Sequence, residues 1–211
     1  GESPFDHKVY VIAGDGCLQE GVASEASSLA GTQELGNLIV IYDDNHISIE
    51  DDTSIAFTED PVARYESYGW HTQTVSWVNE DGHYEDDVAA LSAALTAAEN
   101  ETGRPSLIAL RTIIGAPTPK LQNTGGIHGA KLGAEALAGL KEALGMDRDA
   151  MFEVDEAVIK HTRENALTRA DQAMEVWEKQ FDQWAQDNPK EKELFNRLRA
   201  GELPEGWEKS L

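Results

Sequence analysis

Two short polar segments of the sequence carry residue types that could bind a metal ion and a phosphate group. Gly14-Asp15-Gly16 follows one apolar run, and Asp43-Asp44-Asn45 follows another. Gly16 is expected just ahead of a helix N-terminus, where free N–H groups favour an anion such as phosphate. Asp15 would repel that anion unless a hard divalent cation lay between them, and the Asp15 carboxylate and the Asn45 amide oxygen are suitable cation ligands. The pattern predicts a metal-bridged diphosphate site.

Other kinds of site fit these residues less well. Gly-Asp-Gly taken alone is more typical of an ordinary turn after a strand, because all three residue types are favoured there. A dinucleotide fingerprint needs a glycine where the sequence has Gln19, and the sequence contains no P-loop motif. Cys17, near the expected helix N-terminus, could be a reactive thiol, but no oxyanion-hole signature accompanies it. Dehydrogenase, ATPase and thiol-nucleophile sites are therefore disfavoured.

Apolar strands that alternate with helices must position the two segments. Hydrophobic patterning predicts strands over residues 8–13, 38–42, 69–78 and 105–114, and helices over residues 20–35, 61–68 and 86–99. The first run is typical of a buried strand. Short connections indicate βαβ units, and so an open, mostly parallel sheet flanked by helices on both faces. Because ligands bind outside the carboxyl ends of such strands, Asp15 and Asn45 are expected to lie close together.

The chain changes character after the expected sheet. Residues 115–129 predict a long loop, and helices are expected over residues 134–144, 154–187 and 190–199. Residues 1–145 are therefore interpreted as an α/β domain and residues 146–211 as an all-helical extension. Trp177, Phe181 and Trp184 recur at helical spacing, which favours a packing stripe. Four strands cannot close a barrel, so more chain or another chain is expected to cover the sheet edge.

Composition narrows the classes of partner. The 211 residues include 39 acidic and 17 basic side chains, and the net charge of −22 disfavours nucleic acid and anionic membranes as partners. The apolar runs are about five residues long, whereas a membrane-spanning helix needs roughly 20. Cys17 is the only cysteine, which favours a reducing, cytoplasmic location. The first residues, GESPFDH, lack an initiator Met and the features of a signal peptide, and are typical of the interior of a longer chain.

The sequence around the two segments resembles the thiamine-diphosphate motif, which consists of Gly-Asp-Gly, a spacer and then Asn. Here Asp15 and Asn45 lie 30 positions apart, since 45 − 15 = 30. The longer sequences EGVASEASSLAGTQELGNLIVIYDDNHISIE, FTED, RYESYGWH and RTIIG are similar to those of transketolases. This similarity runs from about Val11 to Gly129, and the C-terminal helices ending in LPEGW resemble the segment that leads toward the next transketolase domain. The resemblance implies that the chain has part of the thiamine-diphosphate-binding fold.

The resemblance implies a cofactor-binding role for several residues. Asp15, Asn45 and the backbone carbonyl of Ile47 would bind Mg²⁺ or Ca²⁺. Gly16 and Asn45 would also contact the diphosphate. Ile114 would line the cofactor pocket, although an apolar residue at that position is otherwise typical of a core.

Catalytic roles are also implied by the resemblance. His128 matches a family histidine that approaches both the diphosphate and the substrate, where an imidazole suits proton transfer near neutral pH. Glu20 and Glu25 match acidic residues at the family's subunit interface that are proposed to couple two active sites through protons, although their spacing alone is typical of a solvated helix face. The family often has a second histidine where this sequence has Gly125, which leaves part of the donor-sugar contact open.

The implied activity is transfer of a two-carbon ketol unit from a ketose phosphate to an aldose phosphate, for example from xylulose 5-phosphate to ribose 5-phosphate in the pentose phosphate pathway. Family enzymes are much longer, dimeric, and use a glutamate from a following pyrimidine-binding domain to activate the cofactor. We therefore expect the isolated chain to be inactive without the missing segments or a second subunit. A non-catalytic binding or assembly module, or a related enzyme such as dihydroxyacetone synthase, are the alternatives.

Overall fold

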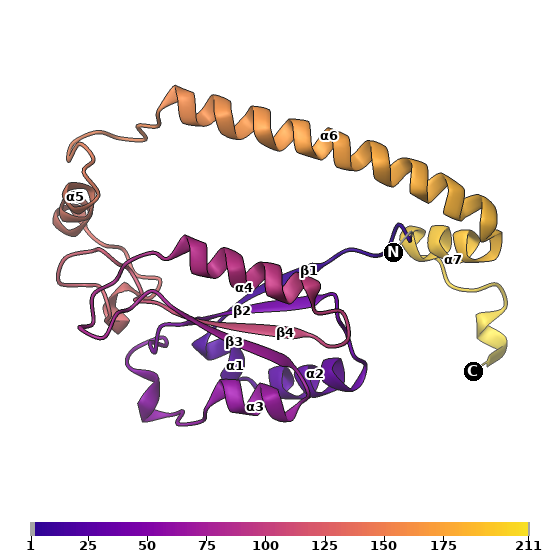
Figure 1. Ribbon diagram of the computed structural model, residues 1–211, viewed down its shortest axis with the longest axis horizontal. Helices are drawn as coiled ribbons and strands as arrows, with labels where there is room; N and C mark the ends of the chain where they lie inside the picture. Colours follow the sequence, from indigo (N-terminus) through magenta and orange to yellow (C-terminus); the bar gives the residue numbers. More distant parts are fainter. Residues whose placement is uncertain (1–2, 211) are drawn as a thin grey trace. The chain divides into compact units, whose positions relative to one another are not determined.

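The computed structural model of the chain describes residues 3–210 and divides into two compact units (Figure 1). The α/β unit is Lys8–Met151. The helical unit joins the N-terminal segment that ends at His7 to the residues from Phe152 onward. No helix within residues 3–210 has both the length and the apolar content needed to cross a bilayer.

A parallel four-stranded sheet forms the centre of the α/β unit, so the predicted fold class is confirmed. Its strands are β1 (Val9–Gly14), β2 (Leu38–Asp44), β3 (His71–Ser76) and β4 (Ser106–Arg111). They lie in the order β1-β2-β4-β3, and every neighbouring pair is parallel. The central strands β2 and β4 are the most buried, because a parallel sheet is covered on both faces. Ile39 in β2 and Leu107 in β4 are fully buried.

Helices cover both faces of the sheet, as the sequence predicts. Figure 1 shows α1 (Asp15–Gln19), α2 (Gly21–Thr32) and α3 (Pro61–Ser67) below the sheet and α4 (Val88–Asn100) above it. One apolar cluster includes Tyr42, Tyr65 and Trp70. The second joins Ile39 and Ile108 of the sheet to side chains of α4. Two separate apolar clusters thus pack against the sheet and fix the strands whose ends carry the polar residues.

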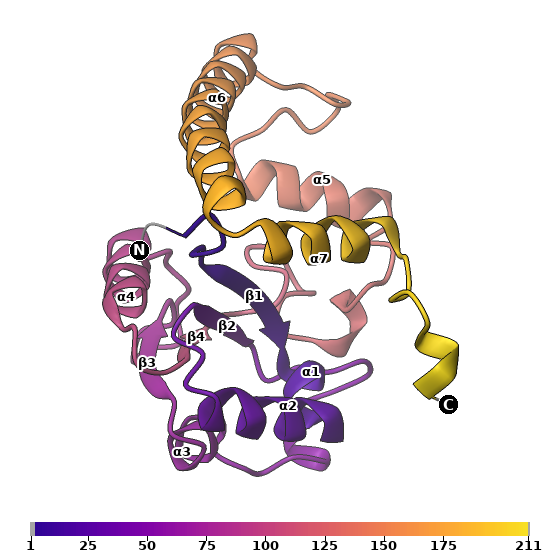
Figure 2. The ribbon, with the colours of Figure 1, turned by 90° about the vertical axis from the view of Figure 1, so that its right-hand side faces the viewer.

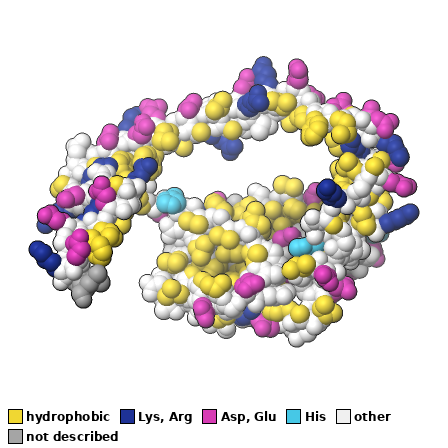
Figure 3. Space-filling view, turned by 180° about the vertical axis from the view of Figure 1, so that it is seen from behind, with side chains coloured by type: hydrophobic (Ala, Val, Ile, Leu, Met, Phe, Trp, Pro, Cys, Tyr) yellow, Lys and Arg dark blue, Asp and Glu magenta, His cyan; other side chains and the backbone are white. Residues whose placement is uncertain are grey.

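Strand β1 is an edge strand, and the expectation that it is buried is wrong. Val9, Tyr10, Val11 and Ile12 are all exposed, Ile12 by 79%. The sheet order gives β1 a single neighbour, β2, so its side chains lack cover that the central strands have. Hydrophobic side chains gather on the side of the α/β unit seen in Figure 3. That further chain covers this edge stays a prediction.

The Gly14-Asp15-Gly16 segment continues from β1 directly into a helix. Asp15 is the first residue of α1, and Gly14 is its N-cap in an extended conformation. Gly16 therefore lies inside the first turn of a short helix. The expectation that Gly16 lies just ahead of a helix N-terminus is wrong. Glu20, with φ −69° and ψ 135°, breaks the helix before α2 begins. The helix predicted over residues 20–35 corresponds to α2, and the sequence did not predict the short helix α1 before it.

The remaining helices lie close to their expected positions. They are α5 (Ala134–Ala143), α6 (Glu156–Asp187) and α7 (Pro189–Ala200). Short 3-10 helices occupy Thr53–Ile55, Gly125–Ile127 and Trp207–Ser210. The second of these interrupts the predicted long loop. Asp60, Asp87 and Asp155 each cap the start of a helix through a side-chain oxygen, which explains why these helices begin where they do.

An aromatic cluster holds the helical unit together. Phe181 stacks on Trp177 with ring centroids 4.8 Å apart, and Phe5 meets Trp184 edge-on at 4.8 Å. Phe195 of α7 joins the same cluster, because α7 turns back after α6 (Figure 2). The aromatic stripe on α6 is therefore a packing surface, as its spacing predicted.

Gly31 of α2 marks a close approach between α2 and the end of α3. A Cβ at this position would lie 1.9 Å from the backbone oxygen of Tyr68. We expect Gly31→Ala to lower the free energy of unfolding by about 1–3 kcal/mol, because the two backbones would have to separate. Gly21→Ala in the same helix is the matched control, since a Cβ there would meet no atom within 4 Å. Urea denaturation of both variants measures the difference, and an equal effect would contradict the close-packing explanation.

Candidate functional site

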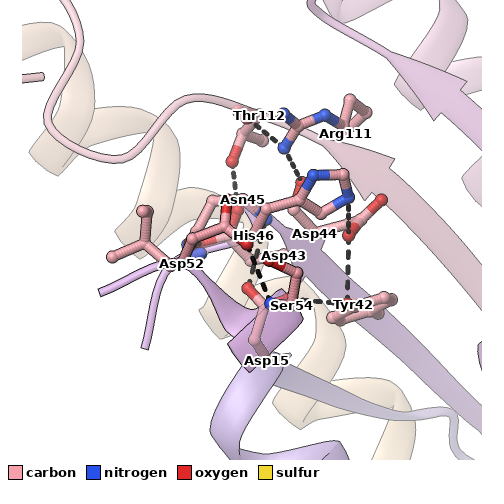
Figure 4. A network of polar contacts seen from close by, with 11 residues as sticks. Asp15, Tyr42, Asp43, Asp44, Asn45, His46, Asp52, Ser54, Arg111 and Thr112 are labelled. Atoms are coloured by element: carbon pink, nitrogen blue, oxygen red, sulfur yellow. Dashed lines mark hydrogen bonds and ion pairs between the residues drawn. The ribbon is translucent and has the colours of Figure 1, made fainter. Parts of the chain in front are cut away.

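The carboxyl ends of β1 and β2 meet at one edge of the sheet and bring the two polar segments together (Figure 4). Gly14 pairs with Asp43 in the strand register, so Asp15 and Asn45 follow neighbouring strand ends. The backbone N–H of Asn45 donates to Asp15 Oδ2 at 3.2 Å. Parallel pairing thus places the two residues side by side although 30 positions separate them.

Asp15 is a buried carboxylate surrounded by neutral donors. Its side chain is 4% exposed, and its Oδ1 accepts a hydrogen bond of 2.8 Å from the Tyr42 hydroxyl. Burial is the largest cause that raises the pKa of Asp15 above its ordinary value, while the hydrogen bonds from Tyr42 and Asn45 act in the opposite direction. None of the ion pairs found within residues 3–210 involves Asp15. A divalent cation would supply the positive charge that this carboxylate lacks.

Asn45 is buried beside Asp15 in a tight turn. Its Oδ1 accepts from the backbone N–H of Ile47 at 2.9 Å, and its Nδ2 donates to Asp43 Oδ2 at 3.1 Å. His46 takes a left-handed conformation, with φ 63°, to close the turn. Ile47 is buried as well, and it pairs with Asp52 across the loop. The turn therefore holds the backbone of Ile47 next to the Asn45 amide oxygen.

These residues fit a hard divalent cation. A carboxylate, an amide oxygen and a backbone carbonyl are the oxygen donors that Mg²⁺ and Ca²⁺ prefer. Residues 3–210 contain no group of three or more His, Cys, Asp or Glu side chains arranged to hold a metal. The expected ligand set contains one such side chain, Asp15, so the two observations are compatible.

The backbone at Gly16 is open to a phosphate group. Gly16 is exposed, and a Cβ there would meet only Ser48 Oγ, at 3.8 Å. An anion could therefore approach the first turn of α1 closely without meeting a side chain on Gly16. The backbone next to Asp15 is therefore accessible to an anion.

A cavity of about 410 Å³ lies beside Asp15. Its lining includes Asp15, Tyr42, Asp44, His46 and Asp52. His46 Nε2 lies 3.2 Å from Asp44 Oδ1. A larger cavity of about 580 Å³, at the start of α5, contains none of these residues. The cavity beside Asp15 is strongly acidic, which favours a cation over a bare anion.

His128 is exposed and follows directly after the 3-10 helix Gly125–Ile127. No hydrogen bond joins it to Asp15 or Asn45 in the described part of the chain. The loop that contains His128 nevertheless packs against the loop after β2. The evidence is that a Cβ on Gly125 would lie 2.0 Å from the backbone oxygen of Glu50. A side chain larger than that of glycine at position 125 would therefore push the two loops apart.

The other residues predicted from the sequence lie outside the cluster around Asp15. Glu20 and Glu25 are exposed, and Glu20 precedes α2 without capping it through its side chain. Ile114 is half-buried beyond the end of β4, and its carbonyl accepts a hydrogen bond from Asn123. Their predicted roles therefore depend on cofactor or subunit contacts that lie beyond this cluster.

Sequence reasoning missed the side chains that support the cluster. Tyr42 donates to Asp15, and Thr112 donates to Asp43. Arg111 Nη1 binds the backbone oxygens of Asp44, at 2.7 Å, and of Thr112, at 2.9 Å. Strand alternation could have placed Tyr42 and Asp43 on opposite faces of β2, but no local signal could have identified Thr112 as their neighbour.

Comparison with known proteins places the chain in a family. Residues 1–204 match the family model described as "Transketolase, thiamine diphosphate binding domain". The transketolase of Mycobacterium tuberculosis is 52% identical over 211 residues, which cover 100% of this chain and 29% of that protein. The chain therefore spans less than a third of the length of this relative.

Solved structures agree with this match. The transketolase of Leishmania mexicana has a TM-score of 0.84 at 38% identity, over 99% of this chain and 30% of that one. The Pichia stipitis transketolase, in complex with sedoheptulose 7-phosphate, has a TM-score of 0.81 at 41% identity, over 98% of this chain and 29% of that one. The chain thus belongs to the transketolase family, in which it matches the thiamine diphosphate binding domain.

Proposed function

We propose that this chain is the metal- and diphosphate-binding part of a transketolase, which transfers a two-carbon ketol unit from a ketose phosphate to an aldose phosphate. The observation that carries the proposal is the buried Asp15 carboxylate, joined to Asn45 across the ends of two parallel strands. Family membership supports the same cofactor. The related Pichia stipitis enzyme binds a sugar phosphate, which supports the substrate class.

The residues of this chain hold the cofactor's charged end. Asp15, the amide oxygen of Asn45 and the backbone oxygen of Ile47 would bind Mg²⁺ or Ca²⁺. Gly16 and Asn45 would contact the diphosphate, and Ile114 would pack against the cofactor. The cation offsets the negative charge of the diphosphate and of Asp15, so an acidic chain can bind an acidic cofactor.

Bound thiamine diphosphate supplies the nucleophilic carbon that accepts and then donates the ketol unit. His128 would hold or transfer a proton beside the substrate, since its exposed imidazole lies on a loop anchored next to the loop after β2. Glu20 and Glu25 would face a second subunit and link the two sites through protons. Their exposed side chains are free of the α/β core, which is compatible with such an interface.

Other parts of a transketolase would complete the active site. The chain covers 29% of the length of its Mycobacterium relative, so most of that protein's sequence has no counterpart here. We propose that residues 1–145 bind the metal and diphosphate and that residues 146–211 lead toward a pyrimidine-binding domain. Alone, the chain would bind its cofactor weakly and would not turn over substrate, and the proposed setting is a cytoplasmic homodimer.

A ketol-transfer assay tests this function. The purified chain and the polypeptide encoded by the complete gene are each given thiamine diphosphate, Mg²⁺, xylulose 5-phosphate and ribose 5-phosphate. We expect the complete polypeptide to form sedoheptulose 7-phosphate and the isolated chain to form none, because the chain lacks the partner that activates the cofactor.

The control omits Mg²⁺ and adds EDTA, which should stop the transfer. Absence of transfer by a folded, cofactor-loaded complete polypeptide would replace the proposal with a non-catalytic assembly module. Transfer to formaldehyde in place of ribose 5-phosphate would instead indicate a dihydroxyacetone synthase.

A further inference from the structure

Thr112 follows directly after β4, and its side chain reaches across to β2. Its hydroxyl donates to Asp43 Oδ1, and its backbone N–H donates to the backbone oxygen of Asp44 at 3.1 Å. Thr112 is 9% exposed, so its side chain is shielded from water. Thr112 and Asp43 are 69 positions apart and meet because β2 and β4 pair in parallel.

The second oxygen of Asp43 binds the side chain of Asn45. Asn45 Nδ2 lies 3.1 Å from Asp43 Oδ2, and Asn45 Oδ1 lies 2.9 Å from the backbone nitrogen of Ile47. A carboxylate only accepts hydrogen bonds and a backbone N–H only donates, so both contacts require the same orientation of the amide. The amide oxygen therefore faces away from Asp43 and toward Ile47.

We propose that Thr112 and Asp43 are positioning residues for the cation site. The Thr112 hydroxyl holds the Asp43 carboxylate, and that carboxylate holds the Asn45 amide with its oxygen available to the cation. The inference rests on the proposed function, in which Asn45 is a cation ligand. If the hydroxyl is lost, Asp43 is less constrained and the amide of Asn45 can turn. An amide that turns its NH₂ group to the cation would repel it.

The side chains that donate hydrogen bonds to Asp43 are both neutral. Arg111 is next to Thr112, yet its guanidinium binds backbone oxygens of Asp44 and Thr112 and forms no described ion pair with Asp43. The Asp43 carboxylate is therefore left to accept from neutral donors on both sides. Neutral donors leave its negative charge uncancelled, and an amide held by a charged acceptor is oriented more strongly than one held by a neutral acceptor.

The test compares Thr112→Val with Thr112→Ser in the polypeptide encoded by the complete gene. Mn²⁺ is the probe, and electron paramagnetic resonance measures free Mn²⁺ at saturating thiamine diphosphate. We expect Thr112→Val to raise the Kd for Mn²⁺ about tenfold or more, the usual effect of removing a residue that orients a metal ligand. Thr112→Ser keeps the hydroxyl and should bind Mn²⁺ as the unsubstituted protein does.

Ser27→Ala is the matched control, because it also removes a buried hydroxyl, one that donates to Tyr65 at 3.0 Å in another part of the unit. It should lower the melting temperature in EDTA without changing the Kd for Mn²⁺. An unchanged Kd in Thr112→Val, or an equal rise in Ser27→Ala, would overturn the positioning role. If Thr112→Val does not fold, Thr112→Ala gives the same comparison. Failure of the unsubstituted protein to bind Mn²⁺ would instead overturn the proposed function, and this inference with it.

Discussion

Replacing Asp15 with alanine is expected to abolish the stabilisation of the protein by thiamine diphosphate and Mg²⁺. Asp15 is the buried carboxylate of the expected ligand set, and no other residue of that set carries a negative charge. In the unsubstituted protein, ligand at about 100 times its Kd should raise the free energy of unfolding by about 2.7 kcal/mol. Thermal melts with and without the ligand and metal measure this shift, which Asp15→Ala should reduce to zero.

Two controls separate metal binding from general effects of charge. Asp81→Ala removes one exposed carboxylate from a loop outside the site and should keep the full stabilisation. Adding EDTA to the unsubstituted protein should have the same result as Asp15→Ala, because the cation joins the diphosphate to the carboxylate. A melting shift that is equal in EDTA and in Mg²⁺ would refute the cation-bridged site.

Leu107→Ala is expected to lower the free energy of unfolding by about 2–5 kcal/mol, because truncation of a buried leucine leaves a cavity that the surrounding core fills only partly. Leu107 is 0% exposed in the central strand β4 and belongs to the cluster of Tyr42 and Trp70. The same strand leads to Thr112, so its packing also supports the end of the sheet that carries the site. Guanidinium denaturation in metal-free buffer measures the effect.

Leu29→Ala is the matched control for this prediction. Leu29 is 60% exposed on α2, and the same truncation there should change the free energy of unfolding by no more than about 0.5 kcal/mol. Comparable losses in both variants would mean that the apolar cluster around Leu107 does not stabilise the fold as its burial indicates.

Local patterns accounted for most helices and strands. The apolar runs of the four strands are bounded by turn residues, and Asp60, Asp87 and Asp155 mark helix starts because a carboxylate can bind the free N–H groups there. These are interactions within a few residues, so a sequence can reveal them. Local patterns did not predict the helix that begins at Asp15, because a Gly-Asp-Gly segment is compatible with a strand end, a helix start or a turn.

The juxtaposition of Asp15 and Asn45 also followed from the sequence, although less directly. Parallel strands joined by helices end at the same edge of a sheet, so two polar segments that follow neighbouring strands must meet there. The chemistry of Asp15 and Asn45 predicted a metal-bridged diphosphate. The identification of that ligand as thiamine diphosphate needed the resemblance over the longer sequences.

The sequence by itself determined the element order, the parallel sheet and the pair Asp15 and Asn45, because these depend on local patterns and on a general rule of strand connection. Only the tertiary structure decided that β1 lies at the edge and that Thr112 supports Asp43. It also decided that Phe5 packs with the C-terminal helices. Each of these depends on which distant segments become neighbours, and that choice is made by the burial of the whole core and not by any short stretch of chain.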